Sequence, residues 1–80
     1  AFFFFLDHKT ALQEVLQKNG DIQIEYRLLM EEGPAHSRIF HVEINAGGKI
    51  LGVGAGKSKK AAEQKAAEVA LADLTKRNQQ

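Results

Sequence analysis

The sequence predicts an α+β domain with the element order α-β-β-β-α, in which two helices pack on one face of a three-stranded antiparallel sheet. Three observations lead to this prediction: helical spacing of apolar residues before Gly20, strand-like segments between Ile24 and Ala55, and a long run of helix formers after Ser58. With 80 residues, 44% hydrophobic and 26% charged, the composition is that of one small globular domain.

The first helix is expected over residues 7–18. Asp7 is a favourable N-cap, and Leu6 stands where it can pack against Ala11 as a hydrophobic staple. Asn19-Gly20 follows as a helix stop. The apolar side of the helix is formed by Ala11, Leu12, Val15 and Leu16. The opposite side is polar and free to meet a partner, and it is formed by Thr10, Gln13 and Glu14.

Three antiparallel strands are expected next. The first covers residues 24–30 and places on one face Ile24, Tyr26, Leu28 and Met30. A loop without periodicity covers residues 31–37. The second strand covers residues 38–46, and the side chains expected to face the core are Phe40, Val42 and Ile44. Gly47-Gly48 predicts a tight hairpin turn into a third strand over residues 49–55.

The third strand and the last helix are expected to pack closely. Gly52 and Gly54 alternate on one face of the strand, which indicates that another element approaches its backbone. Ser58 is expected to cap a helix over residues 59–77. Its apolar stripe is expected to comprise Ala62, Ala66, Val69, Ala70 and Leu74. A stripe rich in alanine permits the close approach that the glycines indicate.

The domain itself is expected over residues 7–77, with residues 78–80 as a frayed tail. Residues 1–6 are expected to be a cut edge, a linker or residues added at the terminus. The run Phe2–Phe5 leaves a second interpretation open, an apolar segment that packs onto this domain or a neighbour. The run is far shorter than the roughly 20 residues of a membrane span, and no basic segment precedes it as in a signal peptide.

No catalytic or metal-binding constellation is evident. The sequence has no Cys, which excludes a disulfide scaffold and a Cys-based zinc site. The histidines lack metal-ligand spacing, and His41 is expected to be solvated on the polar face of its strand. Gly52–Ser58 is similar to a nucleotide phosphate loop, but Leu51 stands where that loop requires its first glycine. The chain alone is therefore not expected to be an enzyme.

Lysines surround the predicted start of the last helix, at positions 57, 59 and 60. The free backbone N–H groups and the helix dipole already favour an anion there, so these lysines cost the helix stability and indicate anion binding. A polyphosphate backbone fits this site better than a nucleotide does. A solvated basic turn is the alternative interpretation, and the net charge of +1 indicates no partner by itself.

Three polar surfaces thus stand out: the side of the first helix with Thr10, the loop with His36 and the turn with the lysines. Only the last is basic, which suits a ligand recognised mainly by shape and hydroxyl groups. A-form RNA presents 2′-OH groups along a wide, shallow minor groove. Glu14 accepts a hydrogen bond from a 2′-OH, which deoxyribose cannot donate. The strands lack exposed aromatic residues, so base stacking on the sheet is disfavoured.

On these residues, the chain resembles the double-stranded RNA-binding domain over residues 7–74. The stretches that carry the resemblance are Asp7-His8-Lys9-Thr10-Ala11-Leu12-Gln13-Glu14, Glu25-Tyr26, Phe40-His41-Val42-Glu43-Ile44, and Gly52-Val53-Gly54-Ala55-Gly56-Lys57-Ser58-Lys59-Lys60 followed by Ala62 and Ala66-Ala67. Three features are most similar to the C-terminal domain of bacterial ribonuclease III: Lys9-Thr10-x-Leu12-Gln13-Glu14, Glu32-Gly33-Pro34 and Lys59-Lys60-Ala61-Ala62-Glu63-Gln64.

The resemblance implies binding across two successive minor grooves and the major groove between them. The residues implied for the first minor groove are Thr10, Gln13 and Glu14. Those implied for the second are Pro34, Ala35 and His36. Those implied for the phosphates between are Lys57, Ser58, Lys59, Lys60 and Gln64. Many family members have a lysine where this chain has Glu63, and this departure is expected to weaken phosphate binding.

The resemblance further implies a role in RNA processing, with double-stranded RNA as partner, no membrane and a cytoplasmic location. A covalently linked nuclease domain that dimerises would cut the RNA and would use Mg²⁺, whereas this chain lacks the catalytic acidic motif and is expected to hold no cofactor and no metal. The alternative is a domain of the same fold that mediates protein association with weak or no RNA binding. The lysine turn favours the first hypothesis, and Glu63 with the low net charge leaves room for the second.

Overall fold

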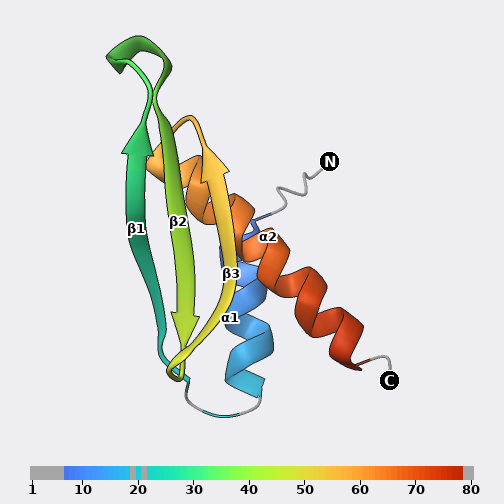
Figure 1. Cartoon of the computed structure of the whole chain (residues 1–80). Helices are drawn as coiled ribbons and strands as arrows, with labels where there is room; N and C mark the ends of the chain where they lie inside the picture. The colour runs from blue at the N-terminus through green and yellow to red at the C-terminus, as the bar shows by residue number, and fades with distance from the viewer. Residues whose placement is uncertain (1–6, 19, 21, 79–80) are drawn as a thin grey trace, which may run out of the picture.

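The computed structural model describes residues 7–18, 20 and 22–78. Its elements are α1 (His8–Lys18), β1 (Ile24–Glu32), the 3₁₀ turn η1 (Ala35–Ser37), β2 (Ile39–Ala46), β3 (Lys49–Gly56) and α2 (Lys59–Asn78). The strands form one antiparallel sheet in the order β1-β2-β3 (Figure 1). The predicted α-β-β-β-α order is therefore confirmed.

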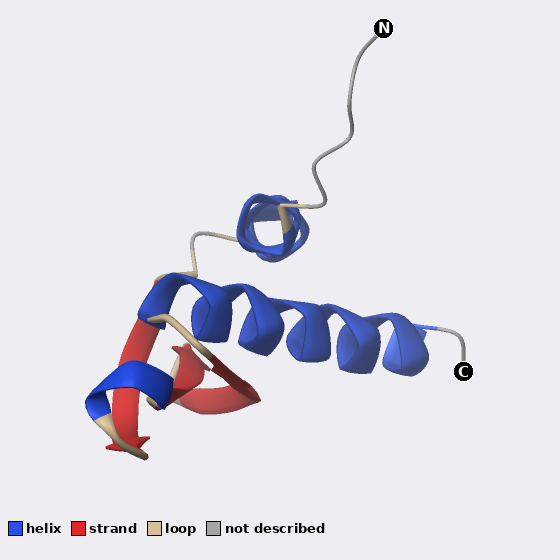
Figure 2. Ribbon diagram, turned by 90° about the horizontal axis from the view of Figure 1, so that it is seen from above, coloured by secondary structure: helices blue, strands red, loops and turns tan. Residues whose placement is uncertain are grey.

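Both helices lie on the same side of the sheet, and the other side is open (Figures 1 and 2). Helix α2 packs directly on β2 and β3, and α1 packs against α2. In Figure 2 α1 is seen end-on while α2 is seen lengthwise, so the two helices cross. The buried core between these layers comprises Leu12, Leu16, Ile44, Ala46, Ala66, Ala67 and Ala70.

The close packing of α2 on β3 is confirmed. A Cβ placed on Gly54 would lie 2.2 Å from the backbone nitrogen of Ala66 and 2.8 Å from the backbone oxygen of Ala62. A Cβ on Gly52 would lie 2.7 Å from the backbone oxygen of Ala66. The backbone of α2 thus rests on the backbone of β3, because glycine on the strand and alanine on the helix leave no side chain between them.

The buried surface of α2 differs from the predicted stripe at two positions. Val69 was expected in the core but is 40% exposed, whereas Ala67 is fully buried. The reason is that α2 lies between the sheet and α1 and so buries two sides. Ala66 meets the glycines of β3, while Ala67 lies in the core with Leu12 of α1.

Strand β1 does not keep the predicted alternation. Leu28 lies opposite Val42, but Met30 lies opposite His41, because the register shifts between Leu28 and Met30. Paired residues share a face of the sheet, so this bulge leaves Leu28 on the helix side and turns Met30 to the open side. The prediction that these two residues share a face was wrong. Glu31 and Glu32 were both predicted in the loop, but both are part of the strand.

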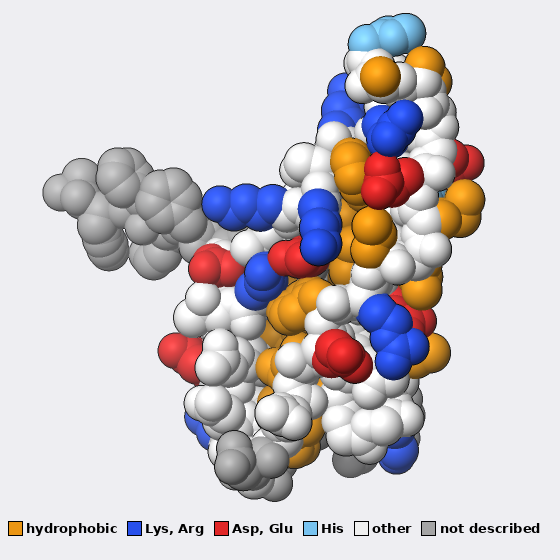
Figure 3. All heavy atoms as spheres, turned by 90° about the vertical axis from the view of Figure 1, so that its left-hand side faces the viewer, with side chains coloured by type: hydrophobic (Ala, Val, Ile, Leu, Met, Phe, Trp, Pro, Cys, Tyr) orange, Lys and Arg blue, Asp and Glu red, His pale blue; other side chains and the backbone are white. Residues whose placement is uncertain are grey.

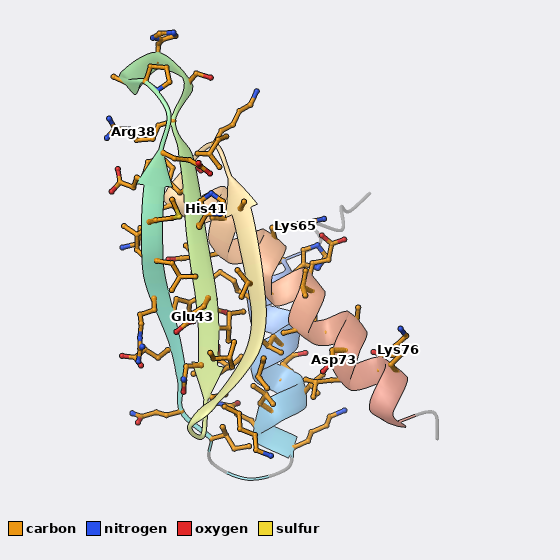
Figure 4. The ribbon with its side chains drawn as sticks, viewed as in Figure 1. Arg38, His41, Glu43, Lys65, Asp73 and Lys76 are labelled. Carbon is orange, nitrogen blue, oxygen red and sulfur yellow. The ribbon has the colours of Figure 1, made fainter. Side chains whose placement is uncertain are left out.

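Polar side chains on the open face of the sheet have partners. His41 and Glu43 lie along β2 (Figure 4). His41 was expected to be solvated, but it is half-buried and its Nε2 lies 2.6 Å from Glu32 Oε1. Glu43 is only 7% exposed, and its Oε2 lies 3.4 Å from Nη1 of Arg27.

The predicted turns and caps are present where the structure describes them. Gly47 and Gly48 have φ of +59° and +84°, as a tight hairpin turn requires. Asn78, predicted in a frayed tail, is the last residue of α2. Predictions for residues 1–6 with the Leu6 staple, for Asn19 and for Gln79-Gln80 concern positions outside the described residues. Neither described helix is long and apolar enough to cross a membrane.

Candidate nucleic-acid interface

The polar side of α1 is fixed by its N-terminal cap. Asp7 Oδ1 accepts a hydrogen bond from the Thr10 backbone N–H at 3.4 Å, and Asp7 Oδ2 accepts one from Thr10 Oγ1 at 2.8 Å. Gln13 and Glu14 follow on the same side and are exposed. Within the part of the chain that the structure describes, no side-chain hydrogen bond or ion pair engages either of them. The helix thus presents an amide and a carboxylate free to meet a ligand.

The loop between β1 and β2 extends beyond the rest of the sheet (Figure 1). Gly33 has φ of +95°, and a Cβ there would lie 2.7 Å from the Ser37 backbone oxygen, so glycine is required at this turn. The Ser37 N–H donates to the Pro34 carbonyl at 2.9 Å and closes η1. The turn holds three exposed residues at the end of the hairpin: Pro34, Ala35 and His36.

Ser58 caps α2 as predicted. Its Oγ accepts a hydrogen bond from the Ala61 N–H at 3.0 Å, and its carbonyl accepts one from the Ala62 N–H at 2.9 Å. The Ser58 hydroxyl hydrogen remains available as a donor. The cap therefore fixes the helix start around which the lysines are placed.

The lysines around this helix start have no carboxylate partner among the ion pairs of the described residues, unlike several other basic side chains of the domain. Several basic side chains of the described segments lie against a carboxylate, among them those of Lys9, Arg27, Arg38 and Lys65. None of these ion pairs uses the exposed Lys57, Lys59 or Lys60. Three unneutralised ammonium groups at the positive end of a helix dipole form an electropositive surface.

Two hollows join the three polar surfaces through this turn. One, of about 500 Å³, is lined by Thr10 and Gln13 of α1 together with Lys60 of α2. The other, of about 370 Å³, is lined by His36 of the hairpin loop together with Lys57. Figure 3 shows Lys and Arg side chains on this face, several of them toward the hairpin and with Asp and Glu side chains among them, and a histidine at the hairpin's end. The two hollows thus place α1, the lysine turn and the loop in that order, although four predicted residues line neither hollow: Glu14, Pro34, Ser58 and Lys59.

Four side chains link the start of α1 to α2, and we call Asp7, Lys9, Glu63 and Gln64 the interhelical cluster. Gln64 Oε1 accepts a hydrogen bond from the His8 N–H at 2.8 Å, and Gln64 Nε2 donates one to Asp7 Oδ1 at 2.8 Å. Lys9 Nζ lies 2.6 Å from Glu63 Oε1 and 4.7 Å from the centroid of the Tyr26 ring. Both ends of the Gln64 amide are therefore used within the domain, although sequence reasoning assigned Gln64 to phosphate.

The electrostatics of the cluster follow from these contacts. The hydrogen bond from Gln64, and then that from Thr10, lower the pKa of Asp7 from 3.8 to about 2. Burial raises the pKa of Tyr26, and the nearby charges of Glu63 and Asp7 add to this effect. Glu63, where many family members have lysine, is only 16% exposed and its charge is balanced by Lys9.

Sequence reasoning missed Arg38, which lines the second hollow with His36 and Lys57. Its Nη1 lies 3.1 Å from Glu31 Oε1, and Figure 4 shows it at the base of the hairpin loop. The only signal in the sequence was a basic residue directly after the loop. Its partner Glu31 lies in β1, whereas the sequence predicted that this strand ends at Met30.

Comparison with known proteins bears on this surface. The family profile described as "Double-stranded RNA binding motif" matches residues 8–74. Ribonuclease 3 of Enterococcus faecalis is 60% identical over 74 residues, covering 92% of this chain and 32% of the relative. Ribonuclease 3 of Bacillus licheniformis is 50% identical over 76 residues, covering 95% of this chain and 30% of the relative. The chain thus spans about a third of the length of these relatives.

A solved structure shares the fold. A solution structure of both dsRBDs of DRB4 with their linker matches with a TM-score of 0.62 and 30% sequence identity, covering 89% of this chain and 46% of that one. The α-β-β-β-α arrangement and the family predicted from the sequence are both confirmed. This chain belongs to the double-stranded RNA binding motif family, and within it is similar to a segment of bacterial ribonuclease 3.

Proposed function

We propose that this domain binds double-stranded RNA by shape, with little dependence on sequence. The observation that carries the proposal is the arrangement in which two hollows share the lysine turn. In the proposed complex, the α1 side chains Thr10, Gln13 and Glu14 contact one minor groove, and Pro34, Ala35 and His36 contact the next. Phosphates across the major groove between them meet Lys57, Ser58, Lys59 and Lys60.

The chemistry of each part suits this role. Gln13 and Glu14 have free acceptors for ribose 2′-OH groups, which fix register and distinguish RNA from DNA. The unpaired lysines attract any phosphate backbone and carry no base information. These lysines favour RNA binding over a purely protein-associating domain, because a solvated face for protein contact has no need of three unneutralised charges at a helix start.

The experiment is a binding titration with three matched ligands: a duplex RNA, the all-deoxy duplex of the same sequence and one of the single RNA strands. We expect tight binding to the duplex RNA and weaker binding to the other two. A second duplex RNA of unrelated sequence should bind as the first does. Equal affinity for all ligands would overturn the shape-based proposal, and no binding to any nucleic acid would favour protein association instead.

We also propose that this domain is the RNA-binding part of a ribonuclease 3 and positions duplex RNA for a covalently linked nuclease domain that dimerises, in the cytoplasm. The chain is similar to a segment that makes up about a third of the length of the ribonuclease 3 relatives, and this similarity supports the proposal. Cleavage, and the Mg²⁺ it would use, belong in this proposal to the nuclease domain. When this domain is deleted from the whole protein, the rate at which a long duplex RNA is cut should fall. A rate equal to that of the whole protein at low enzyme concentration would refute the proposed positioning role.

A further inference from the structure

The start of α1 is held by polar contacts to α2 more than by the sheet. Helix α1 has 11 residues, and its buried side chains are Leu12 and Leu16, one and two turns away from its N-terminus. Its first turn is attached to α2 by Gln64, which meets both the His8 N–H and the Asp7 carboxylate. A helix this short is marginal alone, so its direction depends on such contacts.

The same contacts set where the minor-groove side chains lie relative to the lysine turn. Gln64 lies four residues after Lys60 on α2, and Asp7 caps the turn of α1 that carries Thr10. Lys9 adds a second link, because it is paired with Glu63 and lies over the Tyr26 ring of β1. The interhelical cluster therefore ties the α1 surface to the lysine turn through two neighbouring residues of α2.

We infer that Gln64 and Asp7 are positioning residues for RNA: their hydrogen bond holds the α1 side chains at the spacing from the lysine turn that a duplex requires. This inference rests on the proposed function and deepens it. A-form RNA is stiff and offers its grooves at fixed spacing, so a preorganised surface binds without a cost for ordering α1. Gln64 thus acts through α1, in addition to any contact it makes itself.

At Asp7, a positioning role and charge repulsion predict opposite changes in RNA affinity. A carboxylate beside the lysine turn repels RNA phosphates, so charge alone predicts that its removal tightens binding. Asp7→Ser removes the charge and keeps an N-cap, but the shorter side chain does not reach Gln64. We expect Asp7→Ser to bind duplex RNA more weakly than the wild type, by about three- to tenfold, the effect of losing one such hydrogen bond.

The test compares the wild type with Asp7→Ser, Gln64→Leu and the double variant, each titrated with duplex RNA and its all-deoxy counterpart over a range of salt. Each single variant should bind duplex RNA more weakly than the wild type. The double variant should have about the same affinity as the single variant that binds RNA less tightly. The ratio of RNA affinity to DNA affinity should fall. The dependence of RNA affinity on salt should stay the same, because the phosphate contacts are kept. In Gln64→Leu the pKa of Asp7, followed by NMR, should rise from about 2 toward 3.8.

Glu68→Gln is the matched control, since it breaks an exposed ion pair with Lys65 on α2 away from the cluster. It should bind as the wild type does. Asp7→Ser binding equally or more tightly, or additive losses in the double variant, would overturn the inference and leave Gln64 as a simple phosphate contact. A wild type that fails to bind duplex RNA would instead overturn the proposed function.

Discussion

Replacing Gly54 by alanine tests the close packing of α2 on β3. The added Cβ would lie 2.2 Å from the Ala66 nitrogen, 2.7 Å from the Lys65 carbonyl carbon and 2.8 Å from the Ala62 oxygen. Ordinary van der Waals contact begins at 3.4 Å, so the closest of these contacts is short by about 1.2 Å. All three atoms belong to the α2 backbone, so no side-chain rotation relieves the clash and the helix must move off β3.

The expected loss of stability is large for a domain of this size. Overpacking costs about 1–3 kcal/mol, and a rigid backbone neighbour places Gly54→Ala at the upper end. Alanine returns up to about 1 kcal/mol by restricting the unfolded chain, which leaves a net loss of about 2–3 kcal/mol. For a domain of 60–100 residues this corresponds to a Tm lower by about 10–20 °C. Circular dichroism melts with urea unfolding at 25 °C measure both quantities.

Ala55→Val is the matched control, because Ala55 is the next residue of β3 and is exposed on the open side. It adds bulk to the same strand where nothing of α2 lies, and valine favours strands, so its Tm should stay close to that of the wild type. A Gly54→Ala protein that melts within about 2 °C of the wild type would refute the backbone-on-backbone packing of α2 and β3.

Three further predictions concern the binding surface and its charges. Lys59→Ala/Lys60→Ala should weaken binding to every duplex RNA alike and reduce the salt slope by about two, because two phosphate contacts are lost; unchanged slope and affinity would show a merely solvated turn. Gln13→Ala/Glu14→Ala should lower the ratio of RNA to DNA affinity while the salt slope persists, and an unchanged ratio would contradict their minor-groove role. Because the pKa of Asp7 is about 2 in the folded protein and 3.8 ordinarily, the stability given by its carboxylate is complete above pH 3.8 and is lost as the pH falls toward 2. Urea unfolding between pH 5 and pH 2 should therefore show a steeper loss for the wild type than for Asp7→Ser, and parallel curves would contradict the depressed pKa.

Predictions from the sequence were most accurate where a residue type at a given position has a single structural explanation. Gly52 and Gly54 alternate on a strand beside an alanine-rich helix, and only close backbone packing explains both features. Gly47-Gly48 predicted its hairpin turn, and Ser58 its helix cap, because each satisfies a local geometric need. Which residues are exposed on the polar surfaces was likewise predictable from local periodicity and turn signals, whereas the placement of these surfaces relative to one another depends on contacts between elements.

The sequence-based predictions failed where contacts between distant elements determine which face or partner a side chain has. The bulge that turns Met30 to the open face leaves no mark in a strand whose apolar run continues through Leu29. Ala67 is buried because α1 crosses α2, a relation between two helices that periodicity along one of them cannot give. Gln64 has its partner 57 residues earlier in the chain, so its role within the domain is visible only once the two helices are placed together.

The central claim is that one surface, from α1 through the lysine turn to the hairpin loop, binds duplex RNA. NMR mapping of backbone amides during titration with a short duplex RNA tests it most directly. The account predicts shift changes at residues 10–14, 34–36 and 57–60, with the amides of Glu43 and Val53 on the open side of the sheet unchanged. Changes confined to that open side, with none at the three predicted segments, would contradict the account.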